Sequence, residues 1–386
     1  MSNNISKKIF KLIRSKFTPP LYLHEPNLNK ISVIKIIKNC IENNHISSFG
    51  PYIKKFENEI KYITKAKNCV SVVNGTSAIY LSLFVLGGKL NDEVILPAFN
   101  FIAAANACLQ LRAIPHFAEI ENDTFGIDPV KLEKYLSGCT YKKKNIYFNK
   151  KTKRPIKFII ATHVYGHICK IDAILKVAKK FNLKLIEDAS EALGSFYLKK
   201  HAGTFGDIGI LSFNGNKIVT TGAGGAILCN SYSLSKKIRH ISNTSKKKNT
   251  WKFTHDEQGF NYRMPNINAA LGYHQLKTIK ETIRKKRKLF NIYKSLFNND
   301  KNFEIYQEKN NRKSNYWLQL FILKKKKEKM SSIVKYLLNK KIEVRPGWTS
   351  MTKINYLKKF PRMNCPNAEN AENILINLPS SPQLIK

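Results

Sequence analysis

Short apolar runs alternate with longer stretches of helical periodicity between about residues 68 and 230. The runs occupy residues 69–73, 93–96, 157–162, 184–187, 208–212 and 225–229. Strand-like runs separated by helical stretches predict an α/β fold, with a mostly parallel sheet covered by helices. Ligands of open α/β sheets bind beyond the carboxyl ends of the strands, so the residues that follow each run are the candidates for a site.

The pattern changes in the last part of this region and beyond it. The stretch between runs 208–212 and 225–229 is too short for a crossover helix, which predicts an antiparallel pair of strands there. A long helical pattern covers residues 266–293, and a strand-like WLQLFIL, a helix at 329–339 and an extended KIEVRP follow. We therefore expect a large domain over residues 23–275 and a smaller α+β domain over residues 276–386.

Residues 1–22 are expected to form a basic N-terminal extension. The sequence MSNNISKKIFKLIRSKF is basic and weakly amphipathic, and it lacks the apolar core of a secretory signal. A frayed extension is the favoured interpretation, with contact to a membrane surface as the alternative. Nowhere in the chain does an apolar run reach the roughly 20 residues that a transmembrane helix needs, so we expect no stable membrane insertion.

Composition fits a globular enzyme but carries an unusual charge. Of 386 residues, 43% are hydrophobic and 24% are charged, and the formal net charge is +41. Such a charge is typical of nucleic-acid-binding proteins. Here, however, lysine is spread along the whole chain and forms no compact basic stripe with interleaved aromatics, so no nucleic-acid partner is expected. The seven cysteines show no metal-ligand spacing, and their odd number favours reduced thiols and a cytoplasmic location.

Three segments carry candidate chemistry, and the first is VSVVNGTSAIYLSL. Here a β-branched run and a turn lead through Thr76 and Ser77 into an apolar helix. Free N–H groups at a helix N-terminus and two hydroxyls make a suitable phosphate site. Ser and Thr are also ordinary helix N-caps, so this segment is weak evidence by itself.

The second segment, KLIEDASEALGS, places Asp188 at the end of an apolar run. An anionic Asp there could pair with the ring nitrogen of a pyridine cofactor and hold it protonated, so that the ring accepts electrons. An isolated aspartate at a strand end is more often a helix cap or a metal ligand.

The third segment, GDIGILSFNGNKIVTTGAGG, places Lys217 after a strand and before a glycine-rich turn. A lysine in such a constricted site can lose its proton and attack a carbonyl, as a Schiff base to pyridoxal 5'-phosphate requires. A plain surface lysine is the alternative in this lysine-rich chain. The combination with Asp188 and the phosphate-like turn argues against it.

The motifs together resemble those of the DegT/DnrJ/EryC1/StrS sugar aminotransferases, from about residue 23 onwards. They are, in chain order, NGTSA, PAFNFIAAANA, HVYGHICKIDAI, IEDASEALGS, GDIGILSFNGNKIVTTGAGG and FNYRMPNINAALG. The resemblance implies a fold type I pyridoxal-phosphate-dependent aminotransferase. It also implies that Lys217 is the Schiff-base lysine, that Asp188 is the partner of the pyridine nitrogen and that Phe101 stacks on the cofactor ring.

The same resemblance implies further cofactor contacts. Thr76, Ser77 and Ser212 match phosphate contacts, and Asn261 matches an asparagine that reaches the phosphate from the neighbouring subunit of a homodimer. Glu191 stands where the family more commonly has Gln or His, near the phenolic oxygen of the cofactor. A carboxylate at that place needs either a proton or a compensating charge.

Motifs near the two ends of the chain resemble the LegC-like branch of the family. LHEPNL, SSFG, EVRPGWTS and INLPSSP carry this likeness, which implies amination at C4 of a UDP-linked 4-keto-6-deoxy-N-acetylhexosamine for surface glycans. Arg345, Trp348 and His255 are candidates for the sugar-nucleotide site, with structural roles as the alternative.

The implied reaction transfers an amino group from L-glutamate to the nucleotide-linked keto sugar, with Lys217 as general base and acid. Two other hypotheses stay open at this point. One is a pyridoxal-dependent sugar dehydratase of the same fold, although those relatives typically have histidine in place of the lysine. The other is a basic nucleic-acid-binding protein that kept the fold.

Overall fold

The computed structural model describes residues 5–247, 251–298, 300–324 and 328–385. In this part of the chain a nine-stranded sheet forms the centre, with the order β1-β11-β10-β7-β6-β2-β3 and the pair β4 and β5 attached to β6. Its strands are β1 (Asn68–Val72), β2 (Glu93–Pro97), β3 (Ile114–Ala118), β4 (Thr140–Lys143), β5 (Ile146–Asn149), β6 (Pro155–Thr162), β7 (Lys184–Asp188), β10 (Ile208–Ser212) and β11 (Gly225–Cys229).

Two groups of helices cover this sheet. Helix α4 packs against α5 and α8 and against β1, β10 and β11, α8 packs against β1 and β11, and α5 packs against β2 and β3. Helices α6 and α7 pack against each other, and α7 packs against β6 and β7. Helices α2 and α3 pack on α9 beside β1. These helices are α2 (Lys30–Glu42), α3 (Pro51–Thr64), α4 (Gly75–Val85), α5 (Ala103–Gln110), α6 (Pro129–Cys139), α7 (Ile171–Lys180), α8 (Tyr232–Ile241) and α9 (Asn266–Lys277).

The prediction of a mostly parallel sheet is confirmed. Strands β3, β2, β6, β7 and β10 run parallel, and β11 is antiparallel to both β10 and β1. The central strands are apolar without alternation because helices bury both faces of the sheet. All six apolar runs of the sequence are strands, whereas β3 and the β4–β5 hairpin were not predicted.

A second, smaller sheet lies towards the C-terminus, as predicted. It is antiparallel throughout, with the order β12-β14-β16-β15, and a three-stranded sheet β13-β8-β9 lies apart from it. The helical pattern of residues 266–293 is divided at Thr278 into α9 and α10. The elements are β8 (Phe196–Tyr197), β9 (Lys200–His201), β12 (Phe303–Ile305), β13 (Arg312–Lys313), β14 (Gln319–Leu323), β15 (Arg345–Pro346), β16 (Leu375–Leu378), α10 (Ile279–Leu296), α11 (Met330–Asn339) and α12 (Pro366–Ile374).

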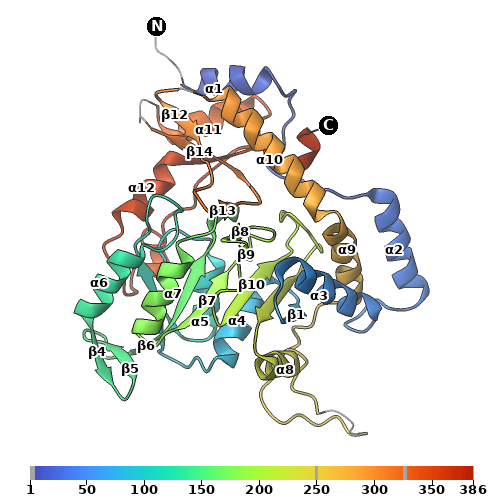
Figure 1. The fold of residues 1–386 in the computed structure, drawn as a ribbon, viewed down its shortest axis with the longest axis vertical. Helices are drawn as coiled ribbons and strands as arrows, with labels where there is room; N and C mark the ends of the chain where they lie inside the picture. Colours follow the sequence, from blue (N-terminus) through green and yellow to red (C-terminus); the bar gives the residue numbers. More distant parts are fainter. Residues whose placement is uncertain (1–4, 248–250, 299, 325–327, 386) are drawn as a thin grey trace.

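Helix α1 (Ile5–Arg14) corrects the interpretation of the N-terminus. It lies beside α11 at one end of the molecule, opposite the β4–β5 hairpin (Figure 1). Ile5, Ile9 and Ile13 are buried there in the apolar core of the smaller sheet. Their four-residue spacing forms one apolar stripe while the basic residues occupy the other faces. Residues 5–14 are therefore a docked helix, not a frayed extension.

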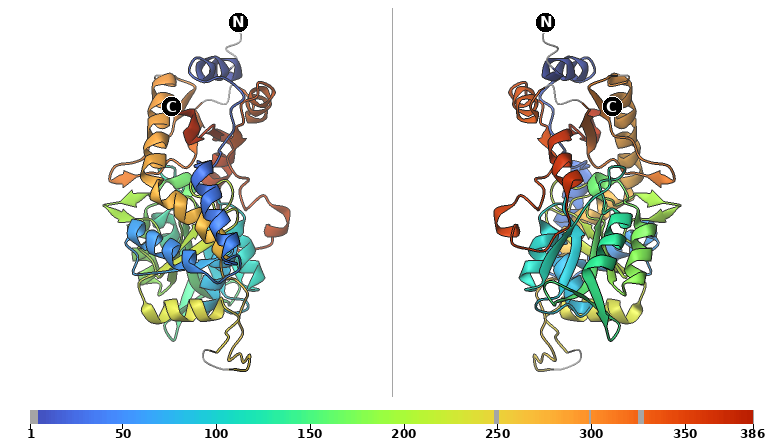
Figure 2. Two further views of the ribbon diagram at one scale, coloured as in Figure 1. Left: turned by 90° about the vertical axis from the view of Figure 1, so that its right-hand side faces the viewer. Right: turned by 90° about the vertical axis from the view of Figure 1, so that its left-hand side faces the viewer.

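Two further features concern the outline of the molecule. Both views in Figure 2 show the segment between α8 and α9 extending away from the body, at the end opposite α1. Among the described helices, none combines the length and the apolar character needed to cross a membrane.

Candidate active site

The segments that the sequence singled out meet at one edge of the large sheet. Asp188 ends β7 and is the register partner of Thr162, the last residue of β6. Ser212 ends β10, which runs parallel to β7. The carboxyl ends of these strands therefore face the same side, as the prediction from the parallel sheet requires.

Lys217 lies in a confined position just beyond Ser212. Its side chain is 12% exposed, and Nζ is 3.3 Å from Oε1 of Glu191. Nζ also lies over the ring of Trp317, 4.0 Å from the centroid. The indole N–H of Trp317 donates to the carbonyl of Asn216 at 2.8 Å, which ties this ring to the lysine segment.

Glu191 is a buried carboxylate on the other side of Lys217. Its Oε2 accepts a hydrogen bond from the backbone N–H of Tyr165 at 2.7 Å. Burial raises the pKa of Glu191, and the positive charge of Lys217 opposes that rise. Lys217 thus supplies the compensating charge that a carboxylate at this place needs.

Asp188 is held from two sides. Its Oδ1 accepts a hydrogen bond from the N–H of Ser190 at 3.1 Å, and its carbonyl accepts one from the N–H of His163 at 3.0 Å. The carboxylate is buried at the carboxyl end of β7. A group bound above this strand end would meet a fixed acidic side chain.

The N-terminus of α4 faces two serine hydroxyls. Asn74 caps this helix by accepting a hydrogen bond from the N–H of Ser77 at 2.7 Å. A Cβ atom placed on Gly75 would lie 3.3 Å from Oγ of Ser212 and 3.5 Å from Oγ of Ser190. The absence of a side chain at Gly75 therefore leaves a small space between a helix N-terminus and two hydroxyls, which is the composition of a phosphate site.

Aromatic rings form a wall beside the carboxylates. Trp348 packs on Tyr165, with 4.4 Å between ring centroids, and on Phe99 at 5.4 Å. Phe101 lies 6.3 Å from Trp348 and is 55% exposed. Since Tyr165 also bonds to Glu191, this wall is connected to Lys217. Arg345, by contrast, is exposed on the short strand β15.

Comparison with known proteins identifies the family. The model of the DegT/DnrJ/EryC1/StrS aminotransferase family matches residues 29–386. A GDP-perosamine synthase from Escherichia coli O157:H7 is 35% identical over 349 residues, which cover 90% of each chain. The chain belongs to the DegT/DnrJ/EryC1/StrS aminotransferase family. It is a pyridoxal-phosphate-dependent sugar nucleotide aminotransferase of glycan biosynthesis.

Other members of the family are similar at lower identity. A UDP-4-amino-4,6-dideoxy-N-acetyl-beta-L-altrosamine transaminase from Campylobacter jejuni is 28% identical and covers 94% of this chain and 93% of its own. The structure of Helicobacter pylori PseC, an aminotransferase involved in the biosynthesis of pseudoaminic acid, superimposes with a TM-score of 0.84 at 25% identity over 93% of each chain. These relatives include both GDP-sugar and UDP-sugar enzymes, so they establish the family without selecting the LegC-like branch.

Unpartnered polar atoms agree with a bound cofactor of this family. In the described part of the chain, the amide of Asn100 and Oγ1 of Thr162 are buried without a hydrogen-bond partner. Thr162 ends β6 and is the register partner of Asp188, and Asn100 follows β2, the strand on the other side of β6. Buried polar atoms without partners are costly in a folded protein, so their presence here, together with the space at Gly75, fits a site that receives a polar ligand.

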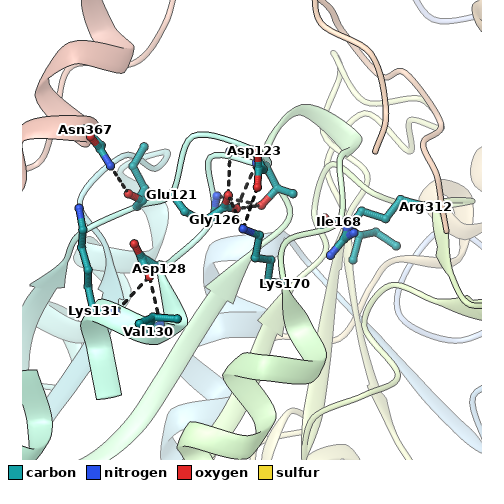
Figure 3. Close-up of polar contacts among 12 residues, drawn as sticks. Glu121, Asp123, Gly126, Asp128, Val130, Lys131, Ile168, Lys170, Arg312 and Asn367 are labelled. Atoms are coloured by element: carbon teal, nitrogen blue, oxygen red, sulfur yellow. Dashed lines mark hydrogen bonds and ion pairs between the residues drawn. The ribbon is translucent and has the colours of Figure 1, made fainter. Parts of the chain in front are cut away.

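The loops that carry Tyr165 are braced from two neighbouring segments (Figure 3). Nζ of Lys170 lies 2.8 Å from Oδ2 of Asp123 and 3.3 Å from Oε2 of Glu121, both in the loop after β3. Nε of Arg312 donates to the carbonyl of Ile168 at 2.9 Å. These contacts fix residues 163–170, and with them Tyr165 beside Glu191.

Two predicted residues lie on the segment that projects between α8 and α9. Asn261 is exposed and forms an isolated bridge with Asn243. His255 has Nδ1 2.7 Å from the carbonyl of Thr244. Ser190 and Trp317, in contrast, are site residues that sequence reasoning missed. Ser190 could have been found from its position two residues after Asp188, whereas Trp317 comes from the segment before β14, 101 residues after Asn216.

Proposed function

We propose that the enzyme transfers the amino group of L-glutamate to C4 of a nucleotide-linked 4-keto-6-deoxy sugar. UDP-4-keto-6-deoxy-N-acetylglucosamine is the favoured acceptor. The observation that carries the proposal is the confined Lys217 amine, set against the Glu191 carboxylate and the Trp317 ring at the carboxyl end of the sheet. A lysine amine held in this way can exchange protons with a bound substrate.

Different residues around Lys217 would bind different parts of the cofactor. The N–H groups at the start of α4, with Ser77, Ser190 and Ser212, would hold the phosphate of the cofactor. Asp188 would face its ring nitrogen, and Phe101 would cover its ring. When bound, pyridoxal phosphate supplies an electron sink for the carbon that loses its proton.

Lys217 would act as the proton carrier in both halves of the reaction. Its amine would take the proton from the α-carbon of L-glutamate and deliver it to the cofactor carbon on the other side of the nitrogen. With the keto sugar, the same transfer would run in the opposite direction. Glu191 keeps Lys217 in position through the 3.3 Å contact. Asp188 would pair with the ring nitrogen of the cofactor and so stabilise the electron-rich state.

The preference for a UDP-linked acceptor rests on the motifs LHEPNL and EVRPGWTS, which resemble the LegC-like branch. A GDP-linked 4-keto-6-deoxy sugar is the second candidate. It is favoured by the 35% identity to a GDP-perosamine synthase, a higher value than the 28% to the transaminase of a UDP-linked sugar. The two candidates share the transferred group and differ in the nucleotide and in the N-acetyl group.

We also propose a homodimer with shared sites and a cytoplasmic location. Helix α2 exposes Ile31, Ile34 and Ile41, and Phe49 follows it with 75% of its surface exposed. Exposed apolar side chains grouped in this way are typical of an interface. All seven cysteines are free thiols, and all but Cys139 are buried, which supports a reducing compartment.

The experiment is a panel of acceptors. The purified enzyme, loaded with pyridoxal phosphate, is incubated with L-glutamate and with UDP-linked and GDP-linked 4-keto-6-deoxy sugars, each with and without an N-acetyl group, and products are identified by mass spectrometry. Amination of the UDP-linked N-acetyl sugar is the expected result. Amination of GDP-linked sugars alone would select the second candidate, and no amination of any acceptor would contradict both.

A further inference from the structure

His24 lies on a segment that is fastened to the end of the smaller domain. The carbonyl of Leu23 accepts a hydrogen bond from the N–H of Ser380 at 2.7 Å. The N–H of Glu25 donates to Oγ of Ser381 at 2.9 Å. Backbone contacts on both sides of His24 therefore fix its position. Residues 23–25 form an anchored segment, called the strap, that carries the ring.

A short chain of contacts connects this strap to Lys217. Nζ of Lys286, which is completely buried, donates to the carbonyl of Ser380 at 2.7 Å and to that of Trp317 at 2.8 Å. The ring of Trp317 in turn lies under Nζ of Lys217. The segment that carries His24 is thus connected through Ser380 and Lys286 to Trp317, and through the ring of Trp317 to Lys217.

The ring nitrogens of His24 are buried although the residue as a whole is only partly buried. No residue in the described part of the chain forms a hydrogen bond with either nitrogen. Burial lowers the pKa of His24 well below its usual value, and the charges of Lys286 and Lys217 lower it further. The imidazole is therefore neutral, with one donor and one acceptor that lack a protein partner.

We propose that His24 is a specificity-determining residue that hydrogen-bonds to the sugar of the nucleotide sugar, beside the carbon that receives the amine. Buried polar atoms normally have partners, so two orphaned ring nitrogens indicate a ligand that supplies them. A neutral donor and acceptor pair matches hydroxyl or amide groups of a sugar. A diphosphate or the carboxylates of L-glutamate would instead select a cation. The inference rests on the proposed function.

The test measures the effect of His24 on the half-reaction with the keto sugar separately from its effect on the half-reaction with L-glutamate. For His24→Ala, the half-reaction with L-glutamate is followed by the absorbance of the bound cofactor, and the half-reaction with the keto sugar is followed in the same way from the aminated enzyme. Calorimetry compares binding of the nucleoside diphosphate alone with binding of the nucleotide amino sugar product. Glu25→Ala is the matched control, since its side chain is exposed and only its backbone N–H bonds to Ser381. Thermal melting verifies that each variant is folded.

His24→Ala is expected to lower kcat/KM for the keto sugar roughly tenfold, the effect of one lost hydrogen bond in a buried site. It should weaken product binding by a similar factor, and leave the L-glutamate half-reaction and the nucleoside diphosphate affinity unchanged. His24→Gln, which keeps a donor and an acceptor, should recover part of the loss. Equal losses in both half-reactions, or no loss in either, would overturn the inference. A wild-type enzyme that aminates no keto sugar would contradict the proposed function itself.

Discussion

At the scale of single residues, the Lys217 site is defined by a carboxylate whose charge depends on pH. Burial raises the pKa of Glu191, and Lys217 counteracts this only in part. As the pH falls, Glu191 therefore takes up a proton at a higher pH than an ordinary glutamate does. Uptake of that proton removes the negative charge beside Nζ of Lys217, so the net charge of the Glu191–Lys217 pair becomes more positive.

Glu191→Gln should remove this step from the pH profile. Glutamine still offers an oxygen to the N–H of Tyr165 but has no proton to gain. A hydrogen bond to a charged group contributes about 1.5–3 kcal/mol, so we expect the wild-type kcat/KM for L-glutamate to change about tenfold across the acidic limb and the variant to be flat there. Glu133→Gln, which alters an exposed pair with Lys180, is the control. A variant with an unchanged acidic limb would contradict this role of Glu191.

At the scale of elements, the start of α4 depends on Gly75 having no side chain. A Cβ there would lie 3.1 Å from Cβ of Ser212, closer than ordinary van der Waals contact, and would fill the space between the two serine hydroxyls. Gly75→Ala should leave the protein folded and weaken binding of pyridoxal phosphate at least tenfold, since one or more hydrogen bonds to a charged phosphate are lost. Fluorescence titration of the apoprotein measures this affinity.

Gly138→Ala is the matched control for that substitution. Gly138 lies in α6, and a Cβ placed on it meets no atom within 4 Å. The exchange should keep cofactor affinity and slightly raise the melting temperature, because alanine is the better helix former. If both variants bound the cofactor as the wild type does, the start of α4 would not be the phosphate site.

Helix α1 provides a second prediction at this scale. Ile9 is fully buried in the apolar core of the smaller sheet, whereas Lys11 on the same helix is exposed. Ile9→Ala should lower the free energy of unfolding by roughly 2–4 kcal/mol through lost burial and a residual cavity. Lys11→Ala should change it by less than about 0.5 kcal/mol. Urea unfolding followed by circular dichroism compares the two, and equal midpoints would mean that α1 is not docked in solution.

The elements that sequence reasoning found are those whose pattern is local. Strands β6 and β7 are unbroken apolar runs because both faces are buried, and that property is visible in the chain itself. Strand β3 was missed because Pro115 and His116 interrupt its apolar run. His116 is nevertheless fully buried, and Nδ1 lies 2.8 Å from Oε2 of Glu93 on the neighbouring strand. A partner that satisfies a buried histidine cannot be recognised before the strands are paired.

The residues of the candidate site also fall into two groups, those that a local sequence pattern reveals and those that it does not. Lys217, Asp188 and the start of α4 follow strands directly, so their place at the sheet edge could be predicted from the parallel order. Trp317 and His24 come to the site from distant parts of the chain, near the N-terminus and before β14, across about a hundred residues or more. Such contacts leave no periodicity or spacing in the sequence.

At the scale of the whole molecule, the segment between α8 and α9 projects from the body in Figure 2. The predicted cofactor residue Asn261 lies at the base of this segment, where it pairs with Asn243 just after α8. A large groove with a volume of about 1240 Å³ lies between that segment and α3, and its lining is mostly polar and basic. In the proposed homodimer, a second copy of the chain would cover this groove and the exposed isoleucines of α2.

The homodimer proposal predicts that two inactive chains restore activity when they are combined. Lys217→Ala removes the proton carrier, and Asn261→Ala removes a phosphate contact that would belong to the opposite site. In a hybrid dimer one site collects both changes, while the other keeps Lys217 of one chain and Asn261 of its partner. Random reassortment of equal amounts after partial unfolding should therefore return roughly a quarter of the wild-type activity, assayed at a cofactor concentration at which both parents are inactive. Light scattering and differential tagging verify that hybrids form. Verified hybrids without activity, or a monomeric enzyme that is fully active, would show that each chain completes its own site.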